Sequence, residues 1–174
     1  GVDRAAHLVE QLLGMARLEP EARQAAFRPV ALDALIKQVV ADFSAQAEAN
    51  DIDLGVGACA TLTLNGQAES LRIMLDNLID NALRYSHRGD RIDVELGPQD
   101  GKALLTVRDT GPGIPAADRD RVFERFQRLA GAEIPGSGLG LAIVRQVAAL
   151  HGGEVRLDDA PDGGLLVEVS LPLA

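Results

Sequence analysis

The stretch that decides the fold is LRIMLDNLIDNALRYS, residues Leu71 to Ser86. Its apolar residues recur at the three- and four-residue spacing of an amphipathic helix. Another side of that helix carries residues of a different kind at i, i+4, i+7 and i+8, namely Asn77, Asn81, Arg84 and Tyr85. Two amides, a cation and an aromatic ring suit a metal ion, a phosphate and a flat base. Taken alone, the stretch is equally compatible with a core helix that has two incidental asparagines, so the rest of the chain must decide.

Length and composition bound the class of protein. The 174 residues are enough for one sizeable domain, and 47% are hydrophobic and 25% charged, as in an ordinary soluble protein. The net charge of -9 without a basic stripe argues against nucleic acid as a partner. Cys59 is the only cysteine, so there is no disulfide framework and no cysteine-based metal site. No apolar run approaches the roughly 18 to 20 residues that cross a bilayer, and we expect a cytoplasmic chain that does not contact membrane.

Hydrophobic periodicity predicts the order of the elements. We expect helices over residues 3–18, 30–50, 67–86 and 139–150, and strands over residues 52–56, 61–64, 91–96, 103–108, 154–157 and 165–171. Most strands come as adjacent pairs rather than as strand–helix–strand units. The pattern therefore predicts an α+β fold: a two-layer α/β sandwich with a mixed, mostly antiparallel sheet of about five strands packed on three helices. The Gly- and Pro-containing residues 109–135 are predicted to form a long mobile segment.

Two glycine motifs follow the central helix. DTGPGI, residues 109–114, comes directly after a strand, where its glycines allow a tight bend and close approach to a ligand. Asp109 could accept a hydrogen bond from an exocyclic amine, although the motif is equally typical of a simple turn. GSGLG, residues 136–140, leads into a helix whose unpaired N–H groups suit a polyphosphate. A flexible hinge before a core helix would look similar.

A third motif lies inside the predicted mobile segment. VFERFQR, residues 122–128, places two phenylalanines three residues apart, which could anchor a flexible lid. Arg125 or Arg128 would then reach a phosphate. A short surface helix with solvated arginines explains either single arginine equally well.

In this order, the motifs NLIDNALRYS, DTGPGI, FERF and GSGLGLAIV make the chain similar to the ATP-binding catalytic region of two-component sensor histidine kinases. That family shares its nucleotide-binding fold with DNA gyrase, a heat-shock chaperone family and the mismatch-repair ATPases. The resemblance covers nearly the whole chain, because RAAHLVEQLLGMARLEP resembles the second helix of the family's dimerisation stalk. It implies a stalk remnant at residues 1–19, a linker at 20–29 and an ATP-binding domain with a mobile ATP lid at 30–174.

The resemblance also implies roles for individual residues. Asn81 would coordinate Mg²⁺ with support from Asn77, Arg84 would contact phosphate, and Tyr85 would lie against the adenine. Asp109 would accept a hydrogen bond from the adenine amino group, in a pocket shaped by the glycines of DTGPGI. The complete set of further nucleotide-binding residues implied is Gly111, Gly113, Ile114, Phe126, Arg128, Gly136, Ser137, Gly138, Leu139 and Gly140. Gln127 departs from an aromatic residue that is common there in the family.

Within this fold, the position four residues before the metal-binding asparagine separates two chemistries. The hydrolysing relatives have a Glu there, which acts as general base toward water. Here the residue is Asn77, a neutral amide that cannot accept a proton. Asp76 and Asp80 are each rotated by about 100° from that face, and we expect them to be solvated. The resemblance therefore implies phosphoryl transfer to a side chain rather than ATP hydrolysis.

The three histidines do not fit the family's acceptor motif. The acceptor is followed by an acidic residue and then by Arg or Lys and a Pro, whereas His7, His87 and His151 have other neighbours. We interpret all three as structural or surface residues, and the chain as a fragment that does not autophosphorylate alone. The implied partners are ATP, the histidine-bearing stalk of the same homodimeric kinase and the receiver domain of a response regulator. The alternative function is that of a non-catalytic, regulatory nucleotide-binding module. A gyrase-like ATPase ranks third, because Asn77 argues against it.

Overall fold

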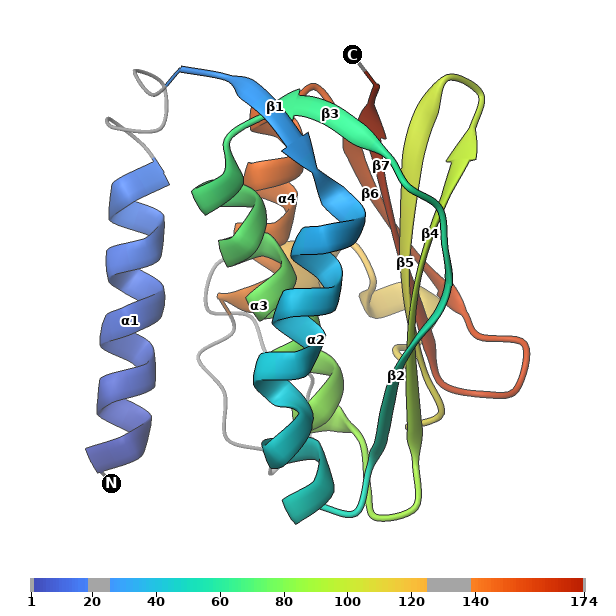
Figure 1. Cartoon of the computed structure of the whole chain (residues 1–174). Helices are drawn as coiled ribbons and strands as arrows, with labels where there is room; N and C mark the ends of the chain where they lie inside the picture. The colour runs from blue at the N-terminus through green and yellow to red at the C-terminus, as the bar shows by residue number, and fades with distance from the viewer. Residues whose placement is uncertain (1, 19–25, 125–138, 174) are drawn as a thin grey trace.

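The computed structural model describes residues 2–18, 26–124 and 139–173 (Figure 1). In chain order its helices are α1 (Val2–Leu18), α2 (Leu32–Ala49), α3 (Ala68–Tyr85) and α4 (Gly140–Leu150). Its strands are β1 (Arg28–Ala31), β2 (Asp53–Cys59), β3 (Thr63–Gly66), β4 (Arg91–Gln99), β5 (Lys102–Asp109), β6 (Glu154–Asp159) and β7 (Leu165–Pro172). Two 3-10 turns, η1 (Ala116–Asp118) and η2 (Arg121–Phe123), follow β5.

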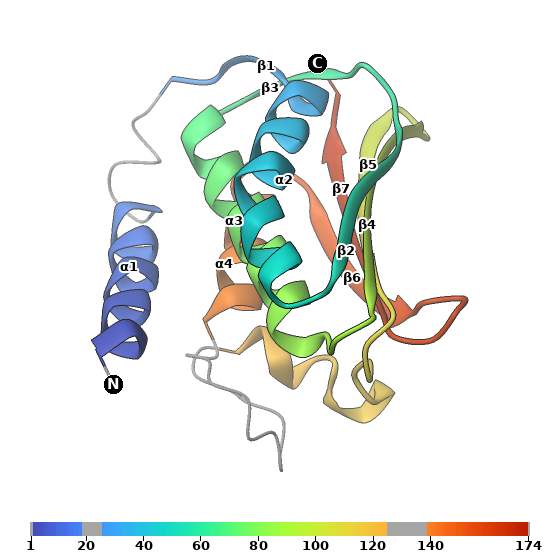
Figure 2. The same ribbon diagram turned by 60° about the horizontal axis from the view of Figure 1, so that its bottom comes forward.

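Five strands form one sheet in the order β2-β4-β5-β7-β6. The pairing of β2 with β4 is parallel, and the other three pairings are antiparallel. Helices α2, α3 and α4 cover one face of this sheet (Figures 1 and 2). The predicted two-layer sandwich with a mixed, mostly antiparallel sheet of five strands is confirmed.

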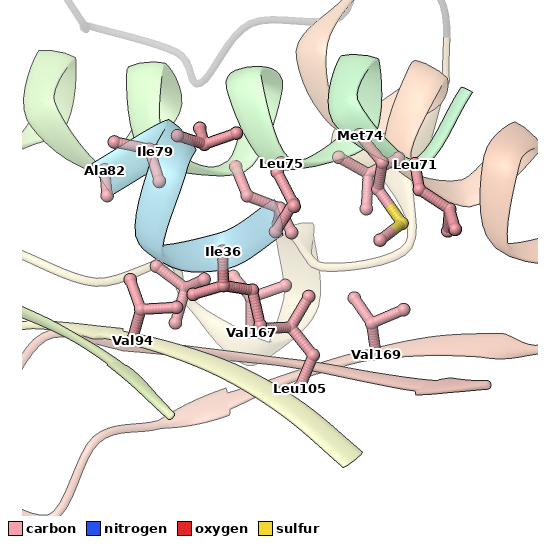
Figure 3. Close-up of a cluster of buried hydrophobic side chains, with 14 of the residues drawn as sticks. Ile36, Leu71, Met74, Leu75, Ile79, Ala82, Val94, Leu105, Val167 and Val169 are labelled. Carbon is pink, nitrogen blue, oxygen red and sulfur yellow. The ribbon is translucent and has the colours of Figure 1, made fainter. Parts of the chain in front are cut away.

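The core lies between α3 and the sheet. Leu71, Leu75 and Ile79 are fully buried on one face of α3, as their helical spacing requires. Opposite them, alternate residues of the central strands, among them Leu105 and Val167, point toward the helices (Figure 3). This packing fixes α3 against the sheet, and so fixes where the polar side of α3 lies.

The structure corrects the predicted start of the second helix. Residues 28–31 form the strand β1, whereas we expected a linker up to residue 29 and a helix from Val30. Val30 pairs with Leu64 of β3 in a small antiparallel sheet of two strands, and α2 begins only at Leu32. The pairing partner is more than thirty residues away, so no local pattern indicated it. Pro29 is tolerated because an edge strand does not need every N–H group.

Helix α1 lies on the outer side of the helical layer, away from the sheet (Figures 1 and 2). Several of its apolar side chains are exposed, among them Val2, Val9 and Leu13. Gln11 is instead buried toward α3. Among the described residues, none of the helices combines the length and the apolar character needed to span a membrane.

Candidate functional site

The first asparagine of α3 is held by the protein on both sides of its amide. Asn77 Nδ2 donates to the Ile73 carbonyl at 2.8 Å, and Asn77 Oδ1 accepts from Gln11 Nε2 of α1 at 3.2 Å. Gly140, at the start of α4, lies close by, because a Cβ there would be 3.6 Å from Asn77 Oδ1. The fold therefore brings the end of the GSGLG motif against the asparagine motif.

One turn further along α3, the second asparagine is in a different situation. Asn81 is half-buried, and its amide makes no hydrogen bond to another described residue. Arg84 Nε donates to Asp80 Oδ2 at 2.8 Å, and His7 Nε2 lies 3.5 Å from the same oxygen. The expectation that Asp80 is solvated was wrong, since its side chain is only 17% exposed and paired.

Asp76 also differs from the solvated carboxylate that we expected. It is half-buried, and its carboxylate lies 3.8 Å from Arg72 Nε. Burial raises the pKa of Asp76, although the nearby Arg72 partly opposes this rise. Asp76 is therefore paired along α3 itself, whereas Asp80 is paired both along α3 and with His7 of α1.

Asp109 ends β5 with its side chain in the interior, at 4% exposure. Its Oδ1 accepts from the backbone N–H groups of Gly111 at 3.0 Å and of Leu165 at 3.2 Å. Its Oδ2 accepts no hydrogen bond from a described residue. Burial raises the pKa of Asp109, and the two backbone donors oppose that rise. The carboxylate is thus oriented by one oxygen while the other remains available to a ligand.

The glycines after Asp109 lie where other parts of the backbone come too close for a side chain. A Cβ on Gly111 would lie 2.8 Å from the Tyr85 carbonyl oxygen and 3.2 Å from Asp109 Oδ1, so the end of α3 meets the DTGPGI turn there. Gly113 has φ of +72°, which an L side chain adopts only with strain. Ile114, the last residue of this motif, is buried in the hydrophobic core.

Sequence reasoning missed the contribution of the β6–β7 hairpin to this site. Gly164 has φ of +91°, and a Cβ there would collide with the Asp109 carbonyl oxygen. The next residue, Leu165, donates to Asp109 Oδ1. The only signal in the sequence is the pair Gly163-Gly164, which by itself indicates a turn. Its contact with Asp109 depends on strand pairing across more than fifty residues, which is not visible locally.

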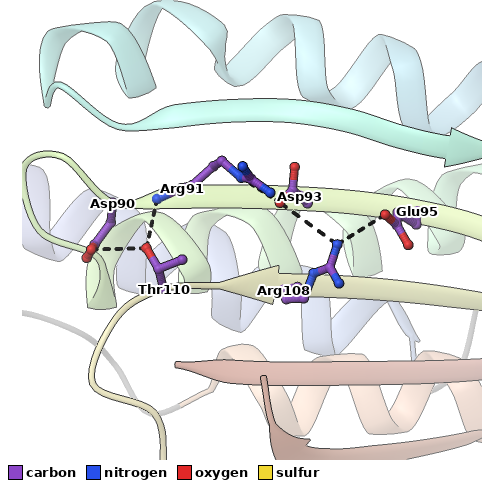
Figure 4. Close-up of polar contacts among 6 residues, drawn as sticks. All are labelled: Asp90, Arg91, Asp93, Glu95, Arg108 and Thr110. Atoms are coloured by element: carbon purple, nitrogen blue, oxygen red, sulfur yellow. Dashed lines mark hydrogen bonds and ion pairs between the residues drawn. The ribbon is translucent and has the colours of Figure 1, made fainter. Parts of the chain in front are cut away.

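Thr110 was also missed, although it fixes the turn that follows Asp109 (Figure 4). Its Oγ1 accepts from the Arg91 backbone N–H at 2.9 Å and lies 3.1 Å from Asp90 Oδ1, to which it donates. These bonds tie the first residue after β5 to the start of β4. On the same two strands, Arg108 contacts Asp93 and Glu95 on the face of the sheet away from the helices (Figure 4).

The described part of the predicted lid region ends at Glu124. Phe123 is buried, and the Arg145 guanidinium of α4 lies 5.3 Å from its ring centroid. Leu139 is buried, and α4 begins at Gly140. The other predicted lid residues lie outside the described residues, namely Arg125, Phe126, Gln127, Arg128, Gly136, Ser137 and Gly138.

The donor set fits a Mg²⁺ ion that arrives with a polyphosphate. Within the described ranges, no three His, Cys, Asp or Glu residues are grouped so that they could hold a metal ion. The Asn81 amide oxygen, which has no described protein partner, is a hard oxygen ligand of the kind that Mg²⁺ prefers. Mg²⁺ usually takes one or two protein oxygens and completes its shell with phosphate and water.

Comparisons with known proteins show which family the chain is similar to. A family model described as histidine kinase-, DNA gyrase B-, and HSP90-like ATPase matches residues 66–174. Sensor protein QseC of Salmonella typhimurium is 38% identical over 171 residues, which are 98% of this chain and 37% of that protein. This chain therefore spans little more than a third of the length of that relative.

Solved structures show the same likeness. The mycobacterial sensor histidine kinase MprB superposes with a TM-score of 0.76 and 37% identity, covering 84% of this chain and 97% of that chain. Full-length ShkA, solved in complex with AMPPNP, gives a TM-score of 0.84 and 30% identity over 99% of this chain and 36% of that one.

Proposed function

The chain belongs to the family of histidine kinase-, DNA gyrase B- and HSP90-like ATPases, and from this premise we propose that it binds Mg-ATP and donates the γ-phosphoryl group to a histidine on a stalk helix. The observation that carries the proposal is the meeting of motifs at Gly111. There the Tyr85 carbonyl at the end of α3 and the Asp109 carboxylate both lie so close to Gly111 that a Cβ on this residue would touch each of them. A carboxylate beside the end of that helix is placed to recognise a base.

The proposal assigns the nucleotide across the ends of α3, β5 and α4. Asp109 Oδ2 accepts from the adenine amino group, and Tyr85 lies against the ring. Arg84 contacts phosphate, and the N-terminal N–H groups of α4 at Gly140 add to that contact. Asn81 holds Mg²⁺, with Asn77 as its support, and the ion supplies charge neutralisation to the phosphate oxygens when it is bound. Support comes from the asparagine and glycine motifs that the fold brings together.

Transfer to a side chain fits the site better than hydrolysis. Asn77 stands where a general base would act on water, and its amide is hydrogen-bonded on both sides by Ile73 and Gln11. A neutral amide does not take a proton from water. A nucleophile that needs no deprotonation before it attacks, such as an imidazole nitrogen with a free electron pair, therefore suits this site better than water does.

The partners of the chain can be inferred from its relatives. QseC is named a sensor protein and MprB a sensor histidine kinase. We infer that residues 1–19 are part of the stalk, that residues 30–174 are the ATP-binding domain, and that the phosphoryl group passes on to a response regulator. The inferred place of the chain is the cytoplasmic part of a membrane-bound sensor.

A transfer assay tests the proposal. The chain is incubated with γ-labelled ATP, Mg²⁺ and a stalk fragment that bears an acceptor histidine. We expect acid-labile, base-stable label on the fragment, none when the acceptor is changed to Gln, and a large loss with Asn81→Ala. Release of the label only as inorganic phosphate, at a rate that the fragment does not change, would show an ATPase instead.

A further inference from the structure

Arg119 joins two segments that lie far apart in the sequence. It follows η1, and its side chain is only 18% exposed. Arg119 Nε donates to the Ile114 carbonyl at 3.1 Å, and Arg119 Nη2 donates to Asp159 Oδ1 of β6 at 2.6 Å. Its Nη1 lies 3.8 Å from Asp158 Oδ1. A guanidinium suits this arrangement because its rigid set of donors serves two acceptors at once.

The residue that Arg119 binds on β6 leads directly to Asp109. Asp159 pairs with Leu165 in the β6–β7 ladder, and the Leu165 N–H donates to Asp109 Oδ1. Gly164, the residue before, packs against the Asp109 carbonyl oxygen. Contacts therefore run in a closed ring from Arg119 through Asp159, Leu165 and Asp109, and back along the chain to Ile114.

Arg119 also balances charge at this end of the hairpin. Asp158 and Asp159 are adjacent and largely exposed, and the Asp159 N–H donates to Asp158 Oδ1. Without the guanidinium these two carboxylates would lie side by side with their mutual repulsion unopposed. The hairpin would then lose its link to the Ile114 carbonyl and the positive charge that neutralises its two carboxylates.

We propose that Arg119 is a positioning residue for recognition of the adenine amino group, because it holds the β6–β7 hairpin where Leu165 can orient the Asp109 carboxylate. The inference rests on the proposed function, since it assumes that Asp109 accepts from the base. Arg119 itself does not contact the nucleotide. It acts through the hairpin, where the Leu165 N–H binds one oxygen of Asp109 and leaves the other oxygen for the ligand.

The test compares the affinities of the chain for ATP and for ITP, whose base has a carbonyl in place of the amino group. We expect wild type to prefer ATP. In Arg119→Ala the affinity for ATP should fall at least about threefold while that for ITP changes less, so that the ATP-to-ITP preference shrinks. Arg121→Ala is the matched control, because Arg121 is exposed two residues away and its ion pair is with Asp118 in the same segment. That variant should keep the wild-type preference.

Two further variants keep the test decisive if Arg119→Ala folds poorly. Arg119→Lys retains the charge but lacks the rigid fork of donors that serves Ile114 and Asp159 at once. Asp159→Asn retains an acceptor without the charge. Each variant should stay folded, and its ratio of ATP to ITP affinity should lie between that of wild type and that expected for Arg119→Ala. An unchanged ATP-to-ITP preference in these folded variants overturns the role of Arg119. A wild-type chain that binds neither nucleotide, or binds both equally, counts against base recognition by Asp109 itself.

Discussion

At the scale of single residues, Asp109 is the carboxylate to which we assign recognition of the adenine amino group. Asp109→Asn keeps an oxygen for the Gly111 and Leu165 donors but places an NH₂ group where Oδ2 was. A donor would then face the donating adenine amine. The lost charge-assisted bond is worth about 1.5–3 kcal/mol, so we expect ATP affinity, measured by calorimetric titration, to fall roughly tenfold to a hundredfold.

The same substitution separates binding from stability. Burial raises the folded-state pKa of Asp109, so between its unfolded and folded pKa values the native state binds more protons, and stability falls as pH rises. The Asn variant does not lose stability in this way. Its free energy of unfolding at neutral pH, measured by urea denaturation, should equal or exceed that of wild type. A variant that binds ATP as tightly as wild type would show that Asp109 serves only the turn.

His151 is the second titratable residue whose environment predicts a measurable effect. It is buried, its Nε2 accepts from the Gln67 N–H at 3.1 Å, and its Nδ1 lies 2.8 Å from the Val147 carbonyl. Those partners require a neutral ring with its proton on Nδ1. The ring also stacks on Phe27, with centroids 5.2 Å apart. His151 thus joins the end of α4 to the start of α3, which agrees with the structural role that we assigned to it.

Burial lowers the pKa of His151, so the unfolded chain binds the proton more readily than the folded one. Stability is then complete above the unfolded pKa and is lost as pH falls toward the folded pKa. We expect urea unfolding of wild type to show this loss as pH falls through and below the unfolded pKa of about 6.5. His151→Gln should lower stability at neutral pH and flatten the slope over that range. An equal slope in both proteins would assign the pH dependence to other groups.

At the scale of elements, the β6–β7 hairpin forms a wall of the site. Gly163 and Gly164 both have positive φ, so alanine strains the backbone at either position. Only at Gly164 does the new Cβ meet Asp109, whereas at Gly163 there is nothing within 4 Å. We expect Gly164→Ala to lose most ATP affinity and Gly163→Ala to keep it, as titration of folded samples would show. Equal affinities in the two variants would mean that the hairpin does not support Asp109.

The helices and strands also show which parts of the fold can be predicted from the sequence alone. Helix α3 was predicted at residues 67–86 and is observed at Ala68–Tyr85, because its apolar period is set by the core that it packs on. Strand β1 was not predicted, since its partner β3 lies more than thirty residues away. Of the site that we propose, Asp109 and Asn81 are predicted from their motifs. Leu165, Thr110 and Arg119 are not, because their roles depend on strand register and on contacts between distant segments.

At the scale of the whole molecule, the sandwich gathers the described parts of the asparagine and glycine motifs at the ends of α3, β5 and α4. Helix α1 adds a contact from outside the sandwich, through Gln11 to Asn77 and through His7 to Asp80. The polar side of α3 is therefore shared between α1 and the nucleotide site that we propose. Any change in the position of α1 acts on Asn77, which we propose supports the metal-binding residue.

The central claim is that this chain binds Mg-ATP through the asparagine side of α3 and the Asp109 pocket. Calorimetric titration of the purified chain with a non-hydrolysable ATP analogue, with and without Mg²⁺, tests it most directly. We expect saturable binding at one site per chain, strengthened by Mg²⁺ in wild type but not in Asn81→Ala. Absence of saturable binding up to millimolar nucleotide, or equal binding with and without Mg²⁺, would contradict the claim.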